Sequence, residues 1–382
     1  MKVAYLGKIQ LSDVDLSYLH EAQQLADITF VVEISPRFMK GPAFNIKSVY
    51  PKSGVFKATE VYPEFQKYSP FIDTDKFYVV NTSGRLWLLK SFWTHIKLLR
   101  FLRKGKFDAI HLAWQPNVYE FILYFLRQKM LLTVHDPLPH SGYSSLIVSL
   151  RRKAAFRLVP RLIILNKAQR QDFIDTYHIK PERIIDSQLS CYTYLRMVQP
   201  ATTGIGQQGS YILFAGRITP YKGLEYLLPA MKKVHEQCPD CRLVVAGSGA
   251  FHFDIEAYKQ LDYIDIRNRF IPDDELVALI QRSAFLVCPY NDATQSGVIM
   301  SAYAFNKPVV ATRVGGLPEM VKDHRYGVIV KEKDEDALAE AIVNLWKQPE
   351  LCSTFAANIK EAYETGENSW KHIAEKLCAV YA

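Results

Sequence analysis

The sequence predicts an α/β protein built from two Rossmann-like domains. Its 382 residues are more than one hydrophobic core usually serves, and 49% of them are apolar. Short apolar runs alternate with amphipathic helical patterns along almost the whole chain. That alternation is typical of βαβ units, whose parallel strands are buried on both faces.

Apolar runs of strand length occur six times in each half of the chain. Those of the first half are residues 2–6, 28–34, 76–81, 109–113, 130–135 and 161–166. Those of the second half are residues 211–215, 242–246, 263–267, 285–289, 308–312 and 327–330. Residues 36–75 are rich in proline and aromatic side chains and break the alternation. They are expected to form an irregular insertion of the kind that often shapes a substrate site.

A polar stretch separates the two halves. Residues 201–210 contain three glycines among polar side chains, a composition typical of a linker. A last apolar-striped helical segment contains Trp370 and runs to the end of the chain. The expected parts are an N-terminal domain at residues 1–200, a C-terminal domain at 201–365 and a terminal helical segment at 366–382.

Charge is distributed unequally between the halves. The chain has a net charge of +8, and residues 1–200 hold 28 Lys and Arg against 16 Asp and Glu, or +12, which leaves −4 for the rest. The basic half favours an anionic surface or an anionic acceptor. Nucleic acid is not expected as a partner, because the basic residues are dispersed and no nucleic-acid-binding module accompanies them.

The location in the cell follows from what the sequence lacks. No apolar run reaches the roughly 20 residues of a membrane-spanning helix, and the first residues match a strand rather than a signal peptide. We expect a cytoplasmic protein, with the inner face of the membrane as a second location. Residues 86–107 combine aromatic residues and leucines with many cations. Such a helix can lie on an anionic membrane or pack on the sheet with a solvated basic face, and both interpretations stay open.

Metal and redox chemistry find little support. Cys238 and Cys241 are the closest pair among six cysteines, but a zinc site needs four ligands and the pair is better explained as a helix end. The acidic pairs Asp13-Val14-Asp15 and Asp73-Thr74-Asp75 are better explained as turn or helix-cap carboxylates. No metal and no cofactor are expected.

The strongest candidate site begins where the first strand of the second half ends. Gly216 allows close approach of a ligand to the backbone, Arg217 offers a planar set of donors, and Lys222 supplies a compact charge before a helix that begins after Gly223. Together they predict a clamp for a diphosphate. Two solvated loop cations would be the simpler interpretation of this segment taken alone.

A second loop of the same half has a similar character. Ser296 precedes a helix whose first amides, at Gly297 and Val298, can bind phosphate oxygens, and its hydroxyl can also cap that helix. The Gly247-Ser248-Gly249 turn fails the dinucleotide fingerprint, because the third glycine is missing. A nicotinamide or flavin site is therefore not predicted.

The order of these motifs resembles the donor domain of family 4 retaining glycosyltransferases, the group 1 class with the GT-B fold. The resemblance covers residues 211–330 well and the whole chain more loosely. It implies two Rossmann-like domains that face each other across a cleft, with the C-terminal helix crossing back to the N-terminal domain. The motifs that carry it are Gly216-Arg217, Lys222-Gly223, Ala246-Gly247-Ser248-Gly249, Ser296-Gly297, Lys307-Pro308-Val309-Val310-Ala311-Thr312 and Gly315-Gly316-Leu317-Pro318-Glu319.

The resemblance also implies roles for residues. Arg217 and Lys222 would hold and stabilise the donor diphosphate, and His135, at a strand end, would lie beside the transferred sugar without a covalent role. The diphosphate cradle would be completed by Gly216, Ser296, Gly297 and Val298. The nucleotide base would lie against Phe270 and Ile271. The acceptor side would include Asp136 and His140, together with Gly7 and Lys8, which stand where the first loop of the family often has paired glycines.

One departure from the family pattern concerns two glutamates, eight residues apart, that usually contact the donor. Ala293 and Ser301 stand in their places. Ser301 could still make one neutral hydrogen bond to a hydroxyl, which is weaker than a charge-assisted bond. Thr294 and Gln295 could replace the contact to the sugar.

The implied function is metal-independent transfer of a hexose or related sugar, with retention, from a UDP- or GDP-linked donor. The acceptor would be a glycan or a lipid-linked oligosaccharide, as in cell-surface polysaccharide biosynthesis. Two alternatives stay open. The missing glutamates would suit a catalytically silent nucleotide-sugar-binding scaffold, and the same fold also serves nucleotide-sugar epimerases.

Overall fold

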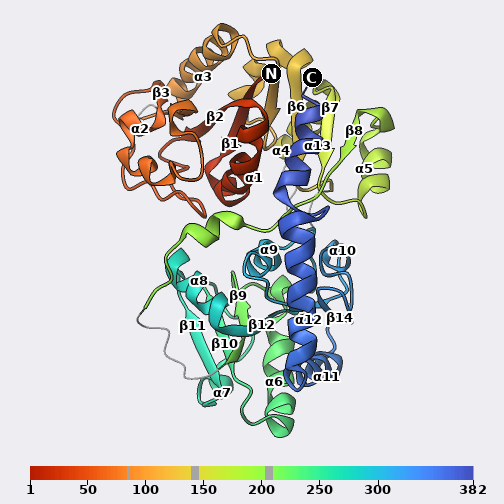
Figure 1. Cartoon of the computed structure of the whole chain (residues 1–382). Helices are drawn as coiled ribbons and strands as arrows, with labels where there is room; N and C mark the ends of the chain where they lie inside the picture. Colours follow the sequence, from red (N-terminus) through yellow and green to blue (C-terminus); the bar gives the residue numbers. More distant parts are fainter. Residues whose placement is uncertain (84–86, 139–145, 203–209, 382) are drawn as a thin grey trace. The chain divides into compact units, whose positions relative to one another are not determined.

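The computed structural model in Figure 1 describes residues 1–83, 87–138, 146–202 and 210–381. The chain divides into two compact units. Unit 1 contains Met1–Leu189 and Trp370–Ala382, and unit 2 contains Ser190–Ser369. Each unit has its own mainly parallel sheet with helices between the strands. The predicted α/β fold class with two Rossmann-like domains is confirmed.

Unit 1 contains an eight-stranded sheet in the order β3-β4-β2-β1-β5-β6-β7-β8. All neighbouring strands are parallel except the antiparallel pair β3 and β4. The strands are β1 (Lys2–Lys8), β2 (Asp27–Ile34), β3 (Gly54–Lys57), β4 (Phe77–Asn81), β5 (Ala109–Leu112), β6 (Met130–Val134), β7 (Arg161–Ile164) and β8 (Ile184–Asp186).

The six strands predicted for the first half are all present in unit 1, together with two that the sequence did not reveal. β3 lies inside the stretch that we expected to be irregular, and β8 has three residues. Both lie at the edges of the sheet. An edge strand pairs on one side only and can be very short, so neither leaves a clear apolar alternation in the sequence.

The helices of unit 1 follow the strands in alternation. They are α1 (Ser12–Leu25), α2 (Ala58–Val61), α3 (Trp87–Lys104), α4 (Leu146–Leu158), α5 (Arg170–Tyr177) and α13 (Trp370–Ala379). Short 3₁₀ segments complete the connections at Ile9–Leu11, Pro63–Tyr68, Thr74–Lys76, Glu120–Lys129 and Pro181–Arg183.

The C-terminal helix α13 packs against α1, the first helix of the chain (Figure 1). Trp370 contacts Tyr18 with ring centroids 6.1 Å apart. The hydroxyl of Tyr381 lies 2.6 Å from that of Tyr18 and 2.6 Å from Nδ1 of His111. Because all three side chains are buried, the end of the chain is anchored inside unit 1.

Unit 2 contains a six-stranded, fully parallel sheet in the order β11-β10-β9-β12-β13-β14. The strands, all expected from the sequence, are β9 (Tyr211–Ala215), β10 (Leu243–Gly247), β11 (Ile264–Asn268), β12 (Ser283–Cys288), β13 (Val309–Thr312) and β14 (Gly327–Val330). The helices are α6 (Leu224–Gln237), α7 (Glu256–Lys259), α8 (Asp273–Arg282), α9 (Gly297–Tyr303), α10 (Leu317–Val321), α11 (Glu335–Trp346) and α12 (Pro349–Lys360).

The division between the units falls earlier than the glycine-rich linker. Tyr192 donates its backbone amide to the Met300 carbonyl at 3.2 Å, and Arg196 donates to the Ala304 carbonyl at 2.7 Å. These bonds tie residues 190–198 to α9, so they belong to unit 2, whereas the sequence placed them in the first domain. The second division lies before Trp370 rather than at residue 366. Most of the predicted linker, residues 203–209, lies outside the described residues.

Within the described ranges, no helix is both long enough and apolar enough to cross a membrane.

Candidate functional site

The strand order of unit 2 reverses at β9, which pairs with β10 on one side and with β12 on the other. In open parallel sheets, ligands bind outside the carboxyl ends of the strands at such a point. The loop after β9 carries Gly216, Arg217 and Lys222, and the loop after β12 leads to Ser296. The sheet therefore brings the two predicted phosphate-binding loops to the same edge.

Gly216 and Val298 meet at this edge. Gly216 has φ +117°, and a Cβ placed on it would lie 3.4 Å from a methyl carbon of Val298. The backbone conformation favours glycine. The first turn of α9, whose amides have no partner inside the helix, is thus next to the end of β9.

Lys222 lies against the side chain that follows β12. Its Nζ is 3.6 Å from the centroid of the Tyr290 ring, and the Tyr290 hydroxyl is 3.2 Å from Oγ of Ser296. Burial, and to a lesser degree the nearby charge of Arg217, lowers the pKa of Lys222 to about 8. The amine is still mostly protonated at neutral pH. Lys222, Tyr290 and Ser296 form one cluster, with the exposed Arg217 beside it.

A tight backbone contact fixes the position of Lys222. Gly223 has φ +66°, and a Cβ there would lie 1.8 Å from the Pro289 carbonyl oxygen. Asn291 donates its backbone amide to the Tyr221 carbonyl at 2.8 Å. The side-chain amide of Asn291 donates to Glu225 at 3.1 Å. These contacts hold the β9 loop against the β12 loop.

Tyr290 and Asn291 were missed by the sequence reasoning. Both lie just beyond Pro289, the residue that follows the buried strand β12. Polar residues at the carboxyl end of a parallel strand are the signal that could have identified them.

The Gly247-Ser248-Gly249 turn has a structural explanation. A Cβ on Gly247 would lie 1.7 Å from the Gly216 carbonyl oxygen, and one on Gly249 would lie 2.0 Å from that of Ile218. Ile218 also donates its amide to the Ser248 carbonyl at 3.0 Å. The two glycines therefore allow the β10 loop to support the backbone that carries Arg217.

Ser296 caps α9, as its sequence position suggested. Its Oγ accepts a hydrogen bond from the Ile299 amide at 3.4 Å, in the usual geometry of an N-cap serine. Ser301 donates its hydroxyl to the Gly297 carbonyl at 3.0 Å. That proton is consequently engaged inside the helix.

The segment expected to contact the donor sugar is held by a glycine turn. The Ala293 carbonyl accepts the Gly316 amide at 3.3 Å, and a Cβ on Gly315, which has φ +47°, would lie 1.6 Å from the Ala293 oxygen. Thr294 is buried and Gln295 is half-buried in the same segment. This turn fixes the backbone just before α9.

The residues expected beside the nucleotide base lie after β11, at the edge of the sheet. Phe270 is 74% exposed and Ile271 is half-buried. Arg269, next to them, binds Glu275 with an N–O distance of 2.7 Å. None of the contacts among the described residues joins Phe270 or Ile271 to the Lys222 cluster.

His135 follows β6 in unit 1. Its Nε2 lies 3.0 Å from the Ala113 carbonyl oxygen, and its ring centroid is 5.2 Å from that of Trp114. Burial lowers the pKa of His135, although Asp136 and the Ala113 bond oppose the shift. The imidazole is therefore neutral at pH 7. The carbonyl of Asp136 accepts a bond from Arg152 at 2.5 Å, and His140 lies outside the described residues.

Gly7 and Lys8 lie at the end of β1, two strands away from β6 in the same sheet. A Cβ on Gly7 would lie 2.2 Å from an oxygen of Asp15, so this glycine is needed for packing. The Nζ of Lys8 lies 3.0 Å from Glu33 and 2.6 Å from Glu120. Burial alone would lower the pKa of Lys8, but the two carboxylates outweigh that effect and raise it.

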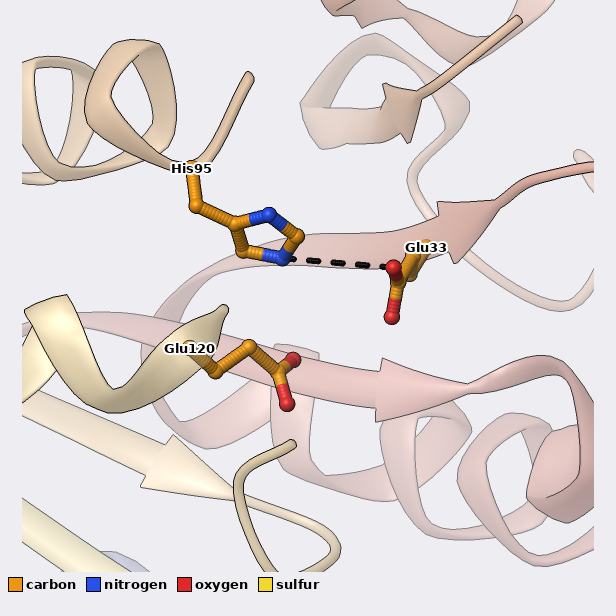
Figure 2. A group of neighbouring side chains, drawn as sticks. All are labelled: Glu33, His95 and Glu120. Atoms are coloured by element: carbon orange, nitrogen blue, oxygen red, sulfur yellow. Dashed lines mark ion pairs between the residues drawn. The ribbon is translucent and has the colours of Figure 1, made fainter. Parts of the chain in front are cut away.

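Glu33, His95 and Glu120 come from three separate segments and point toward one another (Figure 2). His95 Nε2 is 3.9 Å from Glu33, and one ligand atom of each residue lies within 4.8 Å of the others. A metal ion could be held at that spacing, but Lys8 already supplies a cation to both carboxylates. The sequence reasoning missed these three residues.

Comparisons with known proteins agree with this architecture. The family model for Glycosyltransferase Family 4 matches residues 55–185, and the model for Glycosyl transferases group 1 matches residues 209–348. The phosphatidyl-myo-inositol mannosyltransferase of Mycobacterium leprae is 27% identical over 299 residues, which cover 75% of this chain and 76% of that protein.

An uncharacterized glycosyltransferase of Methanocaldococcus jannaschii is 33% identical over 188 residues, which cover 47% of this chain and 46% of that protein. The chain thus spans about half the length of several curated relatives that it matches. The structure of HepE from Anabaena, in complex with UDP and glucose, superposes with a TM-score of 0.69 at 17% identity and covers 100% of this chain and 99% of that one. The chain therefore belongs to the group 1, family 4 glycosyltransferases, which have the GT-B fold.

Proposed function

We propose that this protein transfers a sugar, with retention, from a UDP- or GDP-linked donor to a glycan or lipid-linked oligosaccharide in cell-surface polysaccharide biosynthesis. The observation that carries the proposal is the cluster of Lys222, Tyr290 and Ser296 at the switch point of the unit 2 sheet. The solved HepE complexes, one with UDP and glucose and another with UDP-glucose, support a nucleotide-sugar donor by analogy.

The chemistry of the cluster suits a pyrophosphate. The Lys222 ammonium is held on the Tyr290 ring, and Arg217 offers several donors from an exposed position. Fixed cations of this kind can stabilise the charge that develops on a leaving diphosphate, so the proposal needs no metal ion. The first-turn amides at Gly297 and Val298 would add neutral donors.

Neutral side chains would contact the sugar and support the transfer step. Thr294 and Gln295 would contact the hexose from unit 2, and Ser301 would contact the ribose through its oxygen. His135, which is neutral at pH 7 because burial lowers its pKa, would act as a hydrogen-bonding and electrostatic support. No covalent intermediate on a protein side chain is part of the proposal.

Membrane association is supported by the surface of α3. Its C-terminal half packs into the core through Leu98, Leu99 and Leu102. Its N-terminal half exposes Leu89 (68%) and Trp93 (66%), and its outer face carries exposed cations from Lys90 to Lys104. The two interpretations of this helix are therefore compatible, and the proposal includes binding to an anionic bilayer.

A second candidate function is nucleotide-sugar binding without catalysis. It is favoured by the replacement of both usual carboxylates, since Ala293 has no polar side-chain atom and the Ser301 hydroxyl donates to Gly297. Such a protein would bind the donor but leave it intact with every acceptor.

Radiolabelled nucleotide-sugars incubated with candidate acceptors test both candidates. Formation of a glycosylated product with the parent protein, reduced at least tenfold in Lys222→Ala, supports transfer. Tight donor binding by calorimetry without turnover supports the silent scaffold. Isomerised donor in the absence of acceptor would instead indicate an epimerase.

A further inference from the structure

A cavity of about 600 Å³ opens in unit 1 beside the Lys8 cluster, which consists of Lys8, Glu33, His95 and Glu120. Its wall includes Lys8 and Glu33 from the ends of β1 and β2, Trp114 and Tyr119 from the segment after β5, and two arginines, Arg37 and Arg151. Arg37 belongs to the proline-rich insertion and Arg151 to α4. The cavity is large enough for a small hydroxylated ring with one charged substituent.

The charge of Lys8 is already compensated. Its Nζ binds Glu33 at 3.0 Å and Glu120 at 2.6 Å, and Asn117 donates a further bond to Glu33 at 3.1 Å. Among the described residues that line the cavity, Glu33 is the only carboxylate. Because Lys8 neutralises only one of its two carboxylates, one negative charge remains beside the wall. The two arginines of the wall outweigh that charge.

Neither arginine is paired with a carboxylate in the described ranges. Arg37 is exposed, and its guanidinium lies 5.8 Å from the Phe38 ring centroid. Arg151 donates Nη2 to the Pro116 carbonyl at 3.0 Å, while its buried Nε has no hydrogen-bond partner among the described atoms. Both arginines therefore line one cavity with guanidinium groups that no carboxylate engages.

Two guanidinium groups without carboxylate partners point to an anionic ligand. Planar guanidinium donors match phosphate oxygens in pairs, and Arg is preferred where phosphate is recognised. Trp114, Tyr119 and Leu11 supply apolar wall, and Gln115 and Asn117 supply amides. That combination suits a hydroxylated ring that carries a phosphate.

We propose that this cavity binds a phosphate-bearing acceptor, with Arg37 and Arg151 on the phosphate and the ring of the acceptor against Trp114. The inference rests on the proposed function and on the expectation from the sequence that the N-terminal half holds the acceptor. The phosphate can belong to a membrane lipid headgroup or to a free sugar phosphate, because the recognising chemistry is the same. Glu33 and Lys8 would then bind ring hydroxyls rather than the phosphate.

The test removes each guanidinium without changing the rest of the wall. Arg37→Gln and Arg151→Gln are compared with Arg157→Gln, a control on α4 that removes an exposed arginine outside the cavity wall. Calorimetry measures the binding of glucose 6-phosphate and inositol 1-phosphate to the full chain in the presence of saturating UDP. UDP keeps phosphate away from the Lys222 cluster.

The expected result is a loss of affinity of about tenfold or more in each cavity variant, since hydrogen bonds to charged groups are worth roughly 1.5–3 kcal/mol, with the control unchanged. Flotation with phosphatidylcholine vesicles that contain phosphatidylinositol identifies the source. Binding that Arg37→Gln weakens indicates a lipid, and binding of the soluble esters alone indicates a free phosphate.

The proposal is overturned if Arg37→Gln binds both esters and the vesicles as the parent does, or if unphosphorylated inositol binds as tightly as its phosphate. Arg37 makes no hydrogen bond in the described part of the chain, so its variant stays informative even if Arg151→Gln fails to fold. UDP titration of the same variants separates the two proposals. If UDP does not bind the parent, the proposed donor site is wrong. The cavity proposal is then tested by whether Arg37→Gln weakens binding to the vesicles.

Discussion

The ammonium of Lys222 lies 3.6 Å from the centre of the Tyr290 ring. A cation in contact with an aromatic face is stabilised by the ring quadrupole, yet the same contact removes it from water. Burial is the main reason why the pKa of Lys222 falls to about 8. Lys222, whose charge would hold the donor, therefore begins to lose its proton close to physiological pH.

UDP affinity should decline as the pH rises through about 8. Below that pH, Lys222 is protonated and attracts the diphosphate. Above it, binding must first return the proton to the amine, so affinity falls by at most about tenfold for each further pH unit. Calorimetry in two buffers with different ionisation enthalpies would detect the proton uptake. In Lys222→Ala the uptake should vanish, and persistence of the same uptake there would contradict the assignment.

Gly223→Ala should destabilise unit 2. The new Cβ would lie 1.8 Å from the Pro289 carbonyl oxygen, and the residue would keep φ +66°. Strain of this kind costs about 2–4 kcal/mol, because the two loops must separate. Urea denaturation measures the change. Ser248→Ala, an exposed substitution in the neighbouring turn, should stay within about 0.5 kcal/mol, and equal stability of both variants would refute the close contact.

Lys8→Met should leave Glu33 and Glu120 without their cation. Breaking a buried ion pair by removing one partner costs about 3 kcal/mol or more. Glu120 has a lowered pKa in the folded parent, because the opposing effect of burial is outweighed by Lys8 and His95. The contribution of Glu120 to the free energy of unfolding is therefore present above its pKa in the unfolded chain. It is lost as the pH falls through its pKa in the folded protein.

The loss of stability in Lys8→Met, relative to the parent, should accordingly shrink as the pH is lowered from 7 toward the range in which carboxylates titrate. Protonation there neutralises the unpaired charges. Denaturant midpoints at several pH values measure this. Lys57→Met, which breaks the exposed pair with Asp75, should change stability little. A deficit that is constant with pH would contradict the ion-pair account.

Tyr381→Phe should loosen the C-terminal helix. The hydroxyl contacts Tyr18 and His111, both at 2.6 Å. Burial, and to a lesser degree His135, lowers the pKa of His111 to about 3, so the imidazole cannot compensate by gaining charge. Leaving buried groups unpaired costs about 1–3 kcal/mol. Urea denaturation tests this, and Tyr226→Phe, which removes a half-buried hydroxyl of unit 2, is the matched control.

The local features of the fold, and two of the three members of the Lys222 cluster, could be predicted from the sequence, whereas Tyr290 was missed. Gly216 and Lys222 lie on one strand-to-helix loop, and Ser296 precedes the helix that follows the loop after another buried strand. Because parallel strands end at a common edge, knowing the strands was enough to bring these loops together. The very short edge strands β3 and β8 left no comparable pattern.

The Lys8 cluster could not be predicted in this way. Lys8 and Glu33 are partners in the register of β1 and β2, while His95 lies on α3 and Glu120 in a 3₁₀ helix. Four residues spread over more than a hundred positions meet only once strand order and register are known. In the sequence alone, each is an isolated polar residue in an apolar context.

Replacing Leu89 and Trp93 of α3 by Ser should abolish binding to anionic vesicles. Both side chains are mostly exposed, and burial of apolar area supplies the attachment that basic residues alone do not. Flotation at low salt measures the effect. Replacing Leu25, an exposed leucine at the end of α1, should have no effect, and equal flotation of the parent and the α3 variant would rule out this surface.

The central claim is that unit 2 binds a nucleotide-linked diphosphate through Arg217 and Lys222. A calorimetric titration of UDP into the parent, Arg217→Ala and Lys222→Ala tests it most directly, with circular dichroism to show that each variant is folded. We expect saturable binding by the parent and a loss of affinity of at least about tenfold in each variant. Binding of UDP with unchanged affinity by both folded variants would contradict it.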